Sequence, residues 1–252
     1  MNALDRSLRV IDLLSRYPNG RGLVRISAEL STPPPSLHRL LRVLVDHDVV
    51  QQDQDTRYYK LGPVVLRWAR AFLRHDAIAQ SAAPFLETLR SRVHESVFVT
   101  ELHGDDAYVV ATSESQGMIR FYMGLGQRMP YLHAASARAI LAFQGEERVL
   151  QLIRREVAAQ TVGATSHLEE EALRRVDQVR VSGYAVSQDE IDFGVTTIAV
   201  PIRDSSSVVR ASLSVVAPSQ RLAGARRRTA LQALVDSSRS ISAALGEQLI
   251  AP

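Results

Sequence analysis

Three consecutive prolines, Pro33-Pro34-Pro35, separate two segments that otherwise have helical spacing. A proline has no N–H group and its ring clashes with the preceding helical turn, so a helix does not continue through such a run. A helix does begin readily at proline, because its first N–H groups have no partner within the helix. The sequence therefore predicts one helix that ends near Leu30 and a new one that begins at the last prolines.

The segment before the prolines predicts two helices. Asn2 with Asp5 is typical of a helix start, with an N-cap residue and an acidic third residue. Tyr17-Pro18-Asn19-Gly20 ends that helix, and a second helix is expected from about Val24 to Leu30. Apolar residues recur along one face of the first helix: Leu4, Leu8, Ile11 and Leu14.

The helix after the prolines has two chemically different faces. Its apolar face carries Leu37, Leu40, Leu41 and Leu44, and most of the remaining surface is polar. Residues 49–61 then alternate apolar and polar segments in a pattern that predicts a β-hairpin. Three helices and a hairpin within about 60 residues is the order of a winged helix-turn-helix domain, whose third helix enters the DNA major groove.

Candidate DNA-contacting residues lie mainly on the third helix and on the hairpin. Arginine favours guanine edges, and basic and hydroxyl side chains bind phosphates. The alternative is a winged helix that contacts only protein. The residue pattern favours DNA binding but does not exclude this alternative. The predicted DNA-binding set is Arg25, Pro34, Pro35, Ser36, His38, Arg39, Arg42, Arg57 and Lys60.

Positive charge is concentrated in the same part of the chain. Residues 1–75 contain 12 Lys and Arg against 7 Asp and Glu, whereas residues 76–252 contain 18 against 20. A basic segment is the electrostatic footprint that nucleic-acid binding needs. Of the 30 basic residues 29 are Arg, which GC-rich coding explains, so the location of the surplus is more informative than its composition.

Composition excludes several classes of protein. The absence of cysteine excludes disulfides, zinc ribbons, iron–sulfur clusters and thiol catalysis. The apolar runs are too short to span a bilayer, and Asp5, Arg6 and Arg9 interrupt what would be a secretory signal. A cytoplasmic location is therefore expected. The seven histidines lack ligand spacing, so no metal and no cofactor are predicted.

The strongest sign of catalysis is a loop with Asp189, Glu190 and Asp192, together with His133 in another segment. Paired carboxylates perform acid–base chemistry in some enzymes, but acidic loop residues are mostly solvated or cap a turn. The G-x-S-x-G, H-E-x-x-H and phosphate-binding G-x-x-x-x-G-K motifs are absent from the sequence. The chain is therefore predicted not to be an enzyme, and an enzyme that uses a pocket of the second domain is the less favoured alternative.

The rest of the chain alternates strands and helices after a helical connector. Strands in neighbouring pairs with helices between them indicate an α+β domain built on an antiparallel sheet. The predicted strands include Val97–Leu102, Ala107–Ala111, Met118–Met123, Thr196–Ile202 and Val208–Val216, and the predicted helices span 134–143, 146–157, 167–182 and about 223–249.

Two sets of motifs, in the right order, resemble those of the IclR family of bacterial transcriptional regulators. Pro33-x-x-Ser36-Leu37-His38-Arg39-Leu40-Leu41-x-x-Leu44 is similar to the family's recognition helix, and Arg57-Tyr58-Tyr59-Lys60-Leu61-Gly62 to its wing. In the second part, Gly126-x-Arg128-x-Pro130-x-x-His133-Ala134 and Asp189-Glu190-x-x-x-Gly194-Val195-x-x-Ile198-Ala199-x-Pro201 resemble the family's effector domain.

The sequence departs from the family pattern at four places, one of which is the Pro33-Pro34-Pro35 run, which is richer in proline than the pattern. Ser31-Thr32 stands where members usually have Gly-Leu, and Ala137-Arg138 where they tend to have Gly-Lys. Thr197 occupies a position where cysteine is common. The two later departures concern the effector domain and therefore bear on the class of effector.

The resemblance implies an α+β protein with a winged helix-turn-helix DNA-binding domain over 1–62, a linker helix over 63–75 and a GAF-like effector-binding domain over 76–252. It implies a regulator, most simply a repressor, that binds operator DNA as a homodimer or homotetramer. A small carboxylate or aromatic catabolite would alter that binding. By the same resemblance, the effector site would comprise Leu125, His133, Ala134, Asp189, Glu190, Thr197, Ser212 and Ser214.

Overall fold

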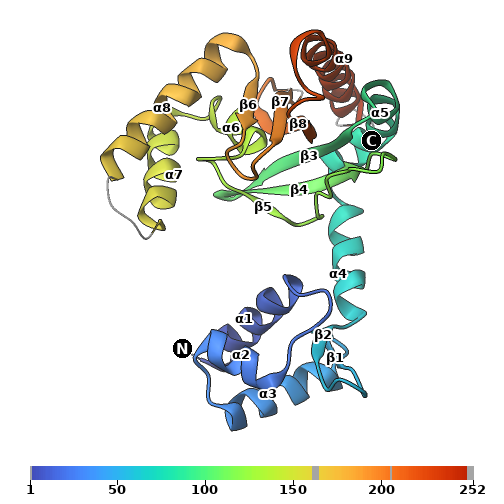
Figure 1. Cartoon of the computed structure of the whole chain (residues 1–252), viewed down its shortest axis with the longest axis vertical. Helices are drawn as coiled ribbons and strands as arrows, with labels where there is room; N and C mark the ends of the chain where they lie inside the picture. The colour runs from blue at the N-terminus through green and yellow to red at the C-terminus, as the bar shows by residue number, and fades with distance from the viewer. Residues whose placement is uncertain (1, 161–164, 205, 249–252) are drawn as a thin grey trace. The chain divides into compact units, whose positions relative to one another are not determined.

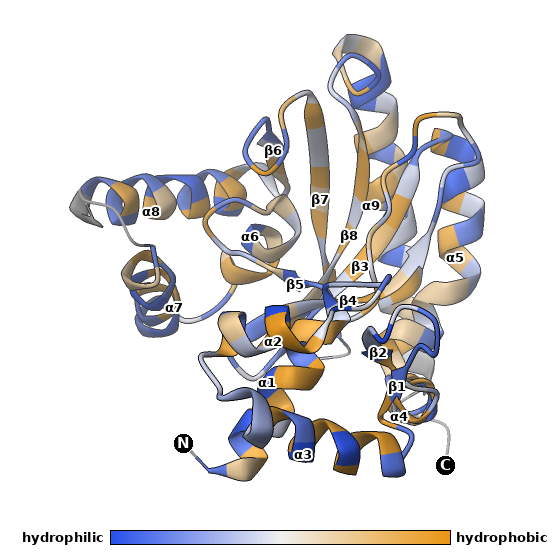
Figure 2. Ribbon diagram, turned by 60° about the horizontal axis from the view of Figure 1, so that its bottom comes forward, coloured by the Kyte–Doolittle hydropathy of each residue, from blue (hydrophilic) through white to orange (hydrophobic). Residues whose placement is uncertain are grey.

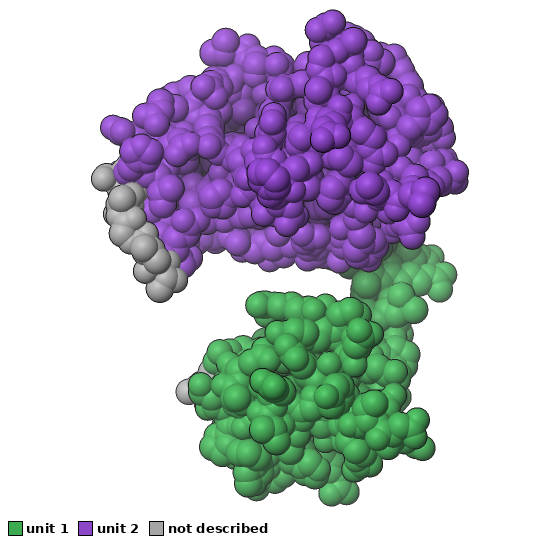
Figure 3. Space-filling model, in the orientation of Figure 1, with its two compact units in different colours: residues 1–75 green, residues 76–252 purple. Residues whose placement is uncertain are grey.

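The computed structural model describes residues 2–160, 165–204 and 206–248. The chain forms two compact units, Met1–His75 and Asp76–Pro252, which are green and purple in Figure 3. Each unit has a hydrophobic core of its own. Figure 1 labels the helices and strands of both units.

The first unit combines helices with a two-stranded antiparallel hairpin (Figure 1). Its order of three helices followed by a hairpin is the one that the sequence predicted. The elements are α1 (Ala3–Ser15), α2 (Leu23–Leu30), α3 (Pro34–Asp46), β1 (Val50–Gln52), β2 (Tyr59–Leu61) and α4 (Val64–Leu73).

The start of α1 is capped as the sequence predicted, but its apolar stripe is only partly buried. The Asn2 side chain accepts a hydrogen bond from the Asp5 amide at 2.8 Å, and the Asp5 carboxylate accepts one from the Asn2 amide at 3.3 Å. Leu4 and Leu8 are exposed, because only the C-terminal half of α1 packs into the core of the unit. The buried residues of α1 are Val10, Leu13 and Leu14.

The turn between α2 and α3 accommodates the departure from the family's Gly-Leu pair. Ser31 has a left-handed backbone with φ of 49°, a conformation that glycine adopts without steric cost. Thr32 is buried, and its carbonyl oxygen accepts a hydrogen bond from the Ser27 hydroxyl at 2.7 Å. The Thr32 hydroxyl in turn donates to the Leu30 carbonyl at 3.2 Å. Hydrogen bonds therefore hold this turn around a strained serine.

The exit from the hairpin requires a glycine at position 62. A Cβ atom there would lie 2.1 Å from the carbonyl oxygen of Asp48, which is far inside van der Waals contact. The Gly62 amide donates to the Val49 carbonyl at 2.8 Å, so the two backbone segments cannot separate without breaking this bond. Close backbone approach explains the glycine that ends the wing motif.

The second unit is an α+β domain around a six-stranded antiparallel sheet in the order β5-β4-β3-β8-β7-β6. This confirms the predicted fold class. The strands are β3 (Ser96–His103), β4 (Asp106–Ser113), β5 (Arg128–Met129), β6 (Ala185–Gln188), β7 (Val195–Arg203) and β8 (Val209–Pro218). The helices are α5 (Ala77–Val93), α6 (Ala135–Leu141), α7 (Glu146–Ala158), α8 (Thr165–Ser182) and α9 (Gly224–Gln248).

Helices cover both faces of this sheet (Figure 1). α5 and α9 lie side by side and pack against one face, whereas α6 packs against β3, β7 and β8 on the other. α8 contacts α6, α7 and the edge strand β6. Consequently β8 is buried on both of its faces along residues 211–217.

Most predicted elements of the second unit are present, and one is not. Helices α6 to α9 agree with the predicted ranges to within two residues at each end. The strand predicted over Met118–Met123 was wrong, because that segment is irregular and Met118 is fully exposed. The edge of β4 pairs instead with the short β5, in which Met129 lies opposite Ala107. Among the helices of the described ranges, none combines the length and hydropathy needed to cross a membrane.

Candidate nucleic-acid interface and effector site

Helix α3 is anchored by leucines and presents basic side chains on its exposed face. Leu37 and Leu41 are completely buried, whereas His38, Arg39 and Arg42 are exposed. In Figure 2 the ribbon of α3 alternates between hydrophobic and hydrophilic colours, as expected of an amphipathic helix. The exposed face therefore has the chemistry that binds phosphates and base edges.

The start of α3 differs from a typical anion-binding helix terminus. Pro34 and Pro35 occupy the first two helical positions and have no N–H to donate. The amides of Ser36 and Leu37 both donate to the Pro33 carbonyl, at 3.1 and 3.0 Å. Helix N-termini bind phosphate through free amides, so a phosphate near this end must be bound mainly by side chains.

The hairpin presents Arg57 from a turn that is held by one carboxylate. Asp53 accepts hydrogen bonds from the amide and the hydroxyl of Thr56, each at 2.9 Å, and these bonds hold the pKa of Asp53 below its usual range. The side-chain amide of Gln52 donates to the Arg57 carbonyl at 3.1 Å. Arg57 itself has a left-handed φ of 60° and an exposed side chain.

A hollow of about 470 Å³ lies between the start of α2, the start of α3 and the hairpin. Arg25 of α2, His38 of α3 and Arg57 of the hairpin all line it. Three positively charged or ionisable side chains from three elements thus border one concave surface. Its remaining lining consists of Gly22, Leu23, Val24, Gln52, Thr56, Tyr58 and Tyr59.

Most of the predicted DNA-binding side chains are exposed and have no partner among the described residues. Within the described part of the chain, the side chains of Arg25, His38, Arg39, Arg42 and Arg57 make no hydrogen bond or ion pair. Pro34 and Pro35 are also exposed, Ser36 is half-buried, and Lys60 is half-buried on β2, where its charge helps to lower the pKa of Asp53.

Arg21 in the same unit is used differently. Its guanidinium lies 3.7 Å from the centroid of the Tyr17 ring and 3.7 Å from a Glu29 carboxylate oxygen. Arg21 therefore stabilises the unit.

In the second unit, three predicted effector residues share the face of the sheet that α6 covers. Ser212 and Ser214 are two residues apart on β8, and Thr197 lies on β7 opposite Val216, which continues the same row. The Ser212 hydroxyl donates to the Ser136 carbonyl of α6 at 2.8 Å. The structure thus brings Thr197, Ser212 and Ser214 together beneath one helix.

Three buried hydroxyl groups in this region have no hydrogen-bond partner among the described residues: Thr100 Oγ1, Ser136 Oγ and Ser214 Oγ. Thr100 lies on β3 directly opposite Ser212, and all three residues are fully buried. Buried polar groups are normally paired, and each unpaired one costs about 1–3 kcal/mol. The face between α6 and the sheet therefore carries hydroxyl groups that no described residue satisfies.

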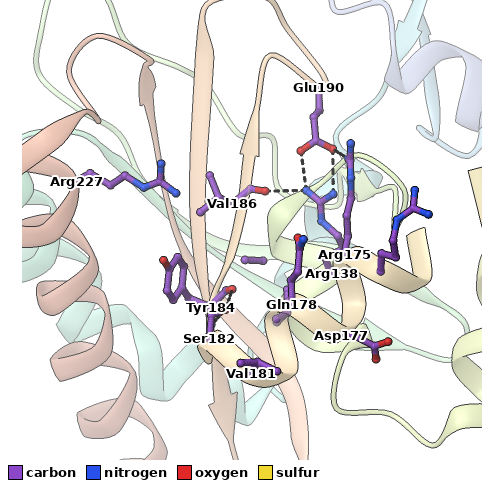
Figure 4. A pocket seen from close by; sticks show the side chains of 13 residues that line it. Arg138, Arg175, Asp177, Gln178, Val181, Ser182, Tyr184, Val186, Glu190 and Arg227 are labelled. Carbon is purple, nitrogen blue, oxygen red and sulfur yellow. Dashed lines mark hydrogen bonds and ion pairs between the residues drawn. The ribbon is translucent and has the colours of Figure 1, made fainter. Parts of the chain in front are cut away.

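Glu190 takes part in an ion-pair network, buried at Arg138 and half-buried at Glu190, that lines a cavity of the second unit (Figure 4). Arg138 of α6 donates to both Glu190 carboxylate oxygens, at 2.9 and 3.0 Å, and to the Val186 carbonyl at 3.0 Å. Arg175 of α8 also pairs with Glu190. The planar guanidinium of Arg138 binds both carboxylate oxygens of Glu190 side by side, a geometry that the family's lysine at this position would not provide.

Two pockets adjoin this network. The larger has a volume of about 830 Å³ and is rich in arginine, with Arg138, Arg174, Arg175 and Arg227 in its lining (Figure 4). The smaller, of about 90 Å³, is lined by Leu132, His133, Leu168, Glu171, Ala172, Arg175 and Glu190. His133 and Glu190 therefore lie together, but at a different place from the β8 serines.

The remaining predicted effector residues lie elsewhere or serve the fold. Leu125 is exposed in the irregular segment before β5. Asp189 has a left-handed φ of 59° and accepts a hydrogen bond from the Gly194 amide at 2.6 Å, so it shapes a turn. Ala134 is buried and is the N-cap residue of α6. Sequence reasoning missed Thr100, Ser136 and Arg175, because only strand register and helix docking bring them to these sites.

Comparison with known proteins agrees with this architecture. The family description "IclR helix-turn-helix domain" matches residues 3–54, and "Bacterial transcriptional regulator IclR C-terminal" matches residues 70–243. The HTH-type transcriptional repressor AllR of Escherichia coli K12 is 30% identical over 245 residues, which cover 97% of this chain and 90% of AllR. The HTH-type transcriptional regulator BhcR of Paracoccus denitrificans is 28% identical over 243 residues, covering 96% of this chain and 86% of BhcR.

Solved structures show the same fold over nearly the whole chain. An IclR transcriptional regulator from Alicyclobacillus acidocaldarius has a TM-score of 0.79 at 26% identity, covering 97% of this chain and 98% of that one. An IclR homologue from Microbacterium hydrocarbonoxydans, crystallised as a complex with 4-hydroxybenzoate, has a TM-score of 0.77 at 23% identity, covering 97% and 99%.

Proposed function

The chain belongs to the IclR family of bacterial transcriptional regulators, and from that premise we propose that it is a repressor whose operator binding responds to a small organic effector. Transcription regulation through a helix-turn-helix domain is the property of the family. The repressor assignment is supported by the similarity to AllR, which is named a repressor. The proposal assigns the protein to the cytoplasm, where bacterial DNA is.

The observation that carries the proposal is the basic face of α3, whose side chains are unpaired among the described residues. His38, Arg39 and Arg42 are exposed on a helix whose opposite face is buried in the core. Arg25 and Arg57 extend this surface around the hollow next to α3. We propose that α3 enters the major groove, with Arg39 and Arg42 at base edges, while Arg57 and Lys60 of the hairpin bind the DNA backbone.

We propose that the effector binds between α6 and the sheet. A carboxylate accepts hydrogen bonds and would satisfy the unpaired hydroxyls of Thr100, Ser136 and Ser214. The 4-hydroxybenzoate in a structure of the same fold supports a small aromatic or carboxylate effector. The effector would shift the population between two arrangements of a dimer, only one of which fits the spacing of the operator half-sites.

Self-association through α4 is part of this proposal, because each operator half-site needs its own winged helix. Leu66 and Trp68 of α4 are 74% and 50% exposed, so two large apolar side chains lack cover. We expect sedimentation of the chain as a dimer or tetramer and dissociation of the Leu66→Glu variant. A wild-type chain that sediments as a monomer at micromolar concentration would contradict this part.

The test of the proposed function is a gel shift of the full-length chain on DNA upstream of its own gene and of the adjacent genes, at two salt concentrations. A discrete shift that resists non-specific competitor is expected, and small carboxylates and aromatics are then screened for release of the DNA. No specific shift, either alone or with any compound of the panel, would favour a winged helix that binds protein.

The effector site is tested separately in the same assay. The Ser214→Ala variant should bind DNA normally and lose most of its response to the releasing compound. Ser238→Ala is the matched control, because Ser238 of α9 is also buried but donates to the Pro201 carbonyl on the other side of the sheet. If Arg174→Ala abolishes the response and Ser214→Ala does not, the effector binds in the arginine-rich pocket instead.

A further inference from the structure

Three potential metal ligands converge in the second unit, on the face of the sheet opposite α6. Asp76 is the N-cap residue of α5, and Glu101 and His103 are alternate residues of β3, so their side chains project from the same face. One ligand atom from each residue lies within 4.8 Å of the other two. Neither the DNA-binding surface nor the effector face includes any of them.

Asp76 contributes a buried carboxylate oxygen that the fold does not use. Its side chain is more than nine-tenths buried, since the residue is only 8% exposed. One oxygen, Oδ1, caps α5 by accepting a hydrogen bond from the Ala79 amide at 2.9 Å. The other, Oδ2, is buried without a hydrogen-bond partner among the described residues. A buried carboxylate oxygen without a donor is unfavourable unless a cation compensates it.

Glu101 places a second carboxylate in the same cluster. Its Oε2 atom is also buried without a hydrogen bond in the described part of the chain, and it lies 3.4 Å from His103 Nε2. The carboxyl groups of Glu101 and Asp76 are adjacent, with their potential ligand atoms within 4.8 Å of each other. The positive charge of Arg210 on β8 attracts the Glu101 carboxylate, but the Arg210 guanidinium forms its ion pair with Asp204, at 3.2 Å. Two carboxyl groups in such contact need either a shared proton or a cation.

We propose that Asp76, Glu101 and His103 bind a divalent transition-metal ion, with Zn²⁺ as the expected occupant. Two carboxylates and an imidazole are ligands that zinc accepts, and a water molecule completes a tetrahedral site. The imidazole disfavours Ca²⁺ and Mg²⁺, which prefer all-oxygen sites. The bound ion joins the start of α5 to β3, so it stabilises the packing of α5 on the sheet.

The histidine spacing along the chain gave no sign of this site. His103 and Glu101 are two residues apart, and Asp76 lies 25 residues earlier at the start of another element. Metal-site searches in sequence depend on short histidine and cysteine patterns, which this cluster lacks. Only the packing of α5 on β3 brings Asp76 close to Glu101 and His103.

The test is zinc binding by the full-length chain, with any affinity tag removed and residual metal stripped with chelator. Calorimetric titration with Zn²⁺ and native mass spectrometry should give one ion per chain. The Asp76→Asn and His103→Asn variants should bind at least about 10-fold more weakly, which corresponds to about 1.4 kcal/mol. Asparagine is as good an N-cap as aspartate, so the first variant removes the ligand charge while it retains the cap of α5.

His94→Asn is the matched control. His94 is an exposed histidine at the end of α5 with a left-handed φ of 59°, a conformation that asparagine tolerates. Its zinc affinity should equal that of the wild type. Equal binding by the wild type, Asp76→Asn and His103→Asn would overturn the proposal, as would a wild-type dissociation constant weaker than about 100 µM.

A second measurement distinguishes a cation from a shared proton. Zn²⁺ should raise the thermal unfolding midpoint of the wild type, because it binds only the folded state. It should not raise that of Glu101→Gln, whose amide mimics the protonated carboxyl. The metal-free wild type and Glu101→Gln could instead unfold at the same midpoint, with neither midpoint changed by Zn²⁺. That result would show that a shared proton satisfies the cluster, and it would overturn the metal site.

Discussion

The two units use the same residue type, arginine, in opposite ways. On α3 and the hairpin, Arg39, Arg42 and Arg57 are exposed and make no ion pair within the described part of the chain. In the second unit, Arg138 is almost completely buried between Glu190 and the Val186 carbonyl. An arginine is therefore available for a ligand only where the fold leaves no carboxylate beside it.

The distribution of acidic residues explains this difference. α3 carries a single acidic residue, Asp46, at its last position. It lies four residues after Arg42, but the two side chains form no ion pair in the described structure, and Arg39 has no acidic residue one turn away on α3. α8 instead places Glu170 and Glu171 four residues before Arg174 and Arg175, and both pairs form. An uncompensated basic face is costly in self-repulsion and useful mainly where a polyanion binds.

The largest effect is expected for the buried arginine, Arg138. Arg138→Ala leaves the Glu190 carboxylate and the Val186 carbonyl in a buried place with fewer donors, and we expect the second unit to lose about 3–5 kcal/mol of unfolding free energy. Urea unfolding followed by circular dichroism measures this loss.

Arg174→Ala is the control for that experiment, because Arg174 is an exposed arginine of α8 that pairs with Glu170 at 3.7 Å. An exposed pair contributes about 0.2–1 kcal/mol. Equal losses in the two variants would show that burial does not distinguish the arginines of the second unit.

The next effect concerns the exposed arginines of α3. The double variant Arg39→Ala/Arg42→Ala should bind operator DNA about 100-fold more weakly. Its discrimination between the operator and a mutated operator should also fall, by about 1–3 kcal/mol for each bidentate contact with a base that is lost. Fluorescence anisotropy on both duplexes measures the affinity and the discrimination. The unfolding free energy should change little, because these side chains make no hydrogen bond or ion pair in the described structure.

Arg16→Ala provides the matched control in the same unit. Arg16 is exposed and pairs with Asp12 on α1, so its charge is already compensated. Its affinity for the operator should stay within about twofold of the wild type, since only side chains that neutralise phosphates release counterions from DNA. A loss as large as that of the double variant would mean that overall charge, and not the face of α3, drives binding.

A smaller and qualitatively different effect is expected for Arg57→Ala. Arg57 lies on the hairpin, where a backbone contact carries no sequence information. The variant should weaken binding to all duplexes alike by about 10-fold and reduce the salt slope by about one unit. Titrations at several salt concentrations check this. If Arg39→Ala, Arg42→Ala and Arg57→Ala all give the same uniform loss, base reading by α3 is wrong.

The smallest effect tests whether the two units unfold independently. Ser31→Gly removes the steric cost of a left-handed serine, so the first unit should gain about 1 kcal/mol. Differential scanning calorimetry should show a higher midpoint for the first unit and an unchanged one for the second. A decrease in stability would mean that the hydrogen bonds around Thr32 need the serine side chain.

The parts of this protein that could be predicted from the sequence depend on residues close together in the chain. The proline run and the leucine spacing sufficed for the start and the two faces of α3, because helix periodicity is local. The same kind of spacing on α1 did not show which of its apolar residues are buried, since Leu4 and Leu8 are exposed whereas Leu14 is buried. The sequence pattern also failed for Met118–Met123, because a strand exists only where another strand pairs with it.

The candidate sites also differ in whether short motifs of the sequence or only the tertiary structure reveals them. The sequence by itself determined the family, the order of the elements of the first unit and the basic face of α3, since these depend on short motifs. Only the tertiary structure decided that Thr100 and Ser214 lie beneath α6, the helix that carries Ser136, and that Asp76 meets Glu101 and His103. Strand register and helix docking decide such meetings, and both depend on contacts between residues far apart in the chain.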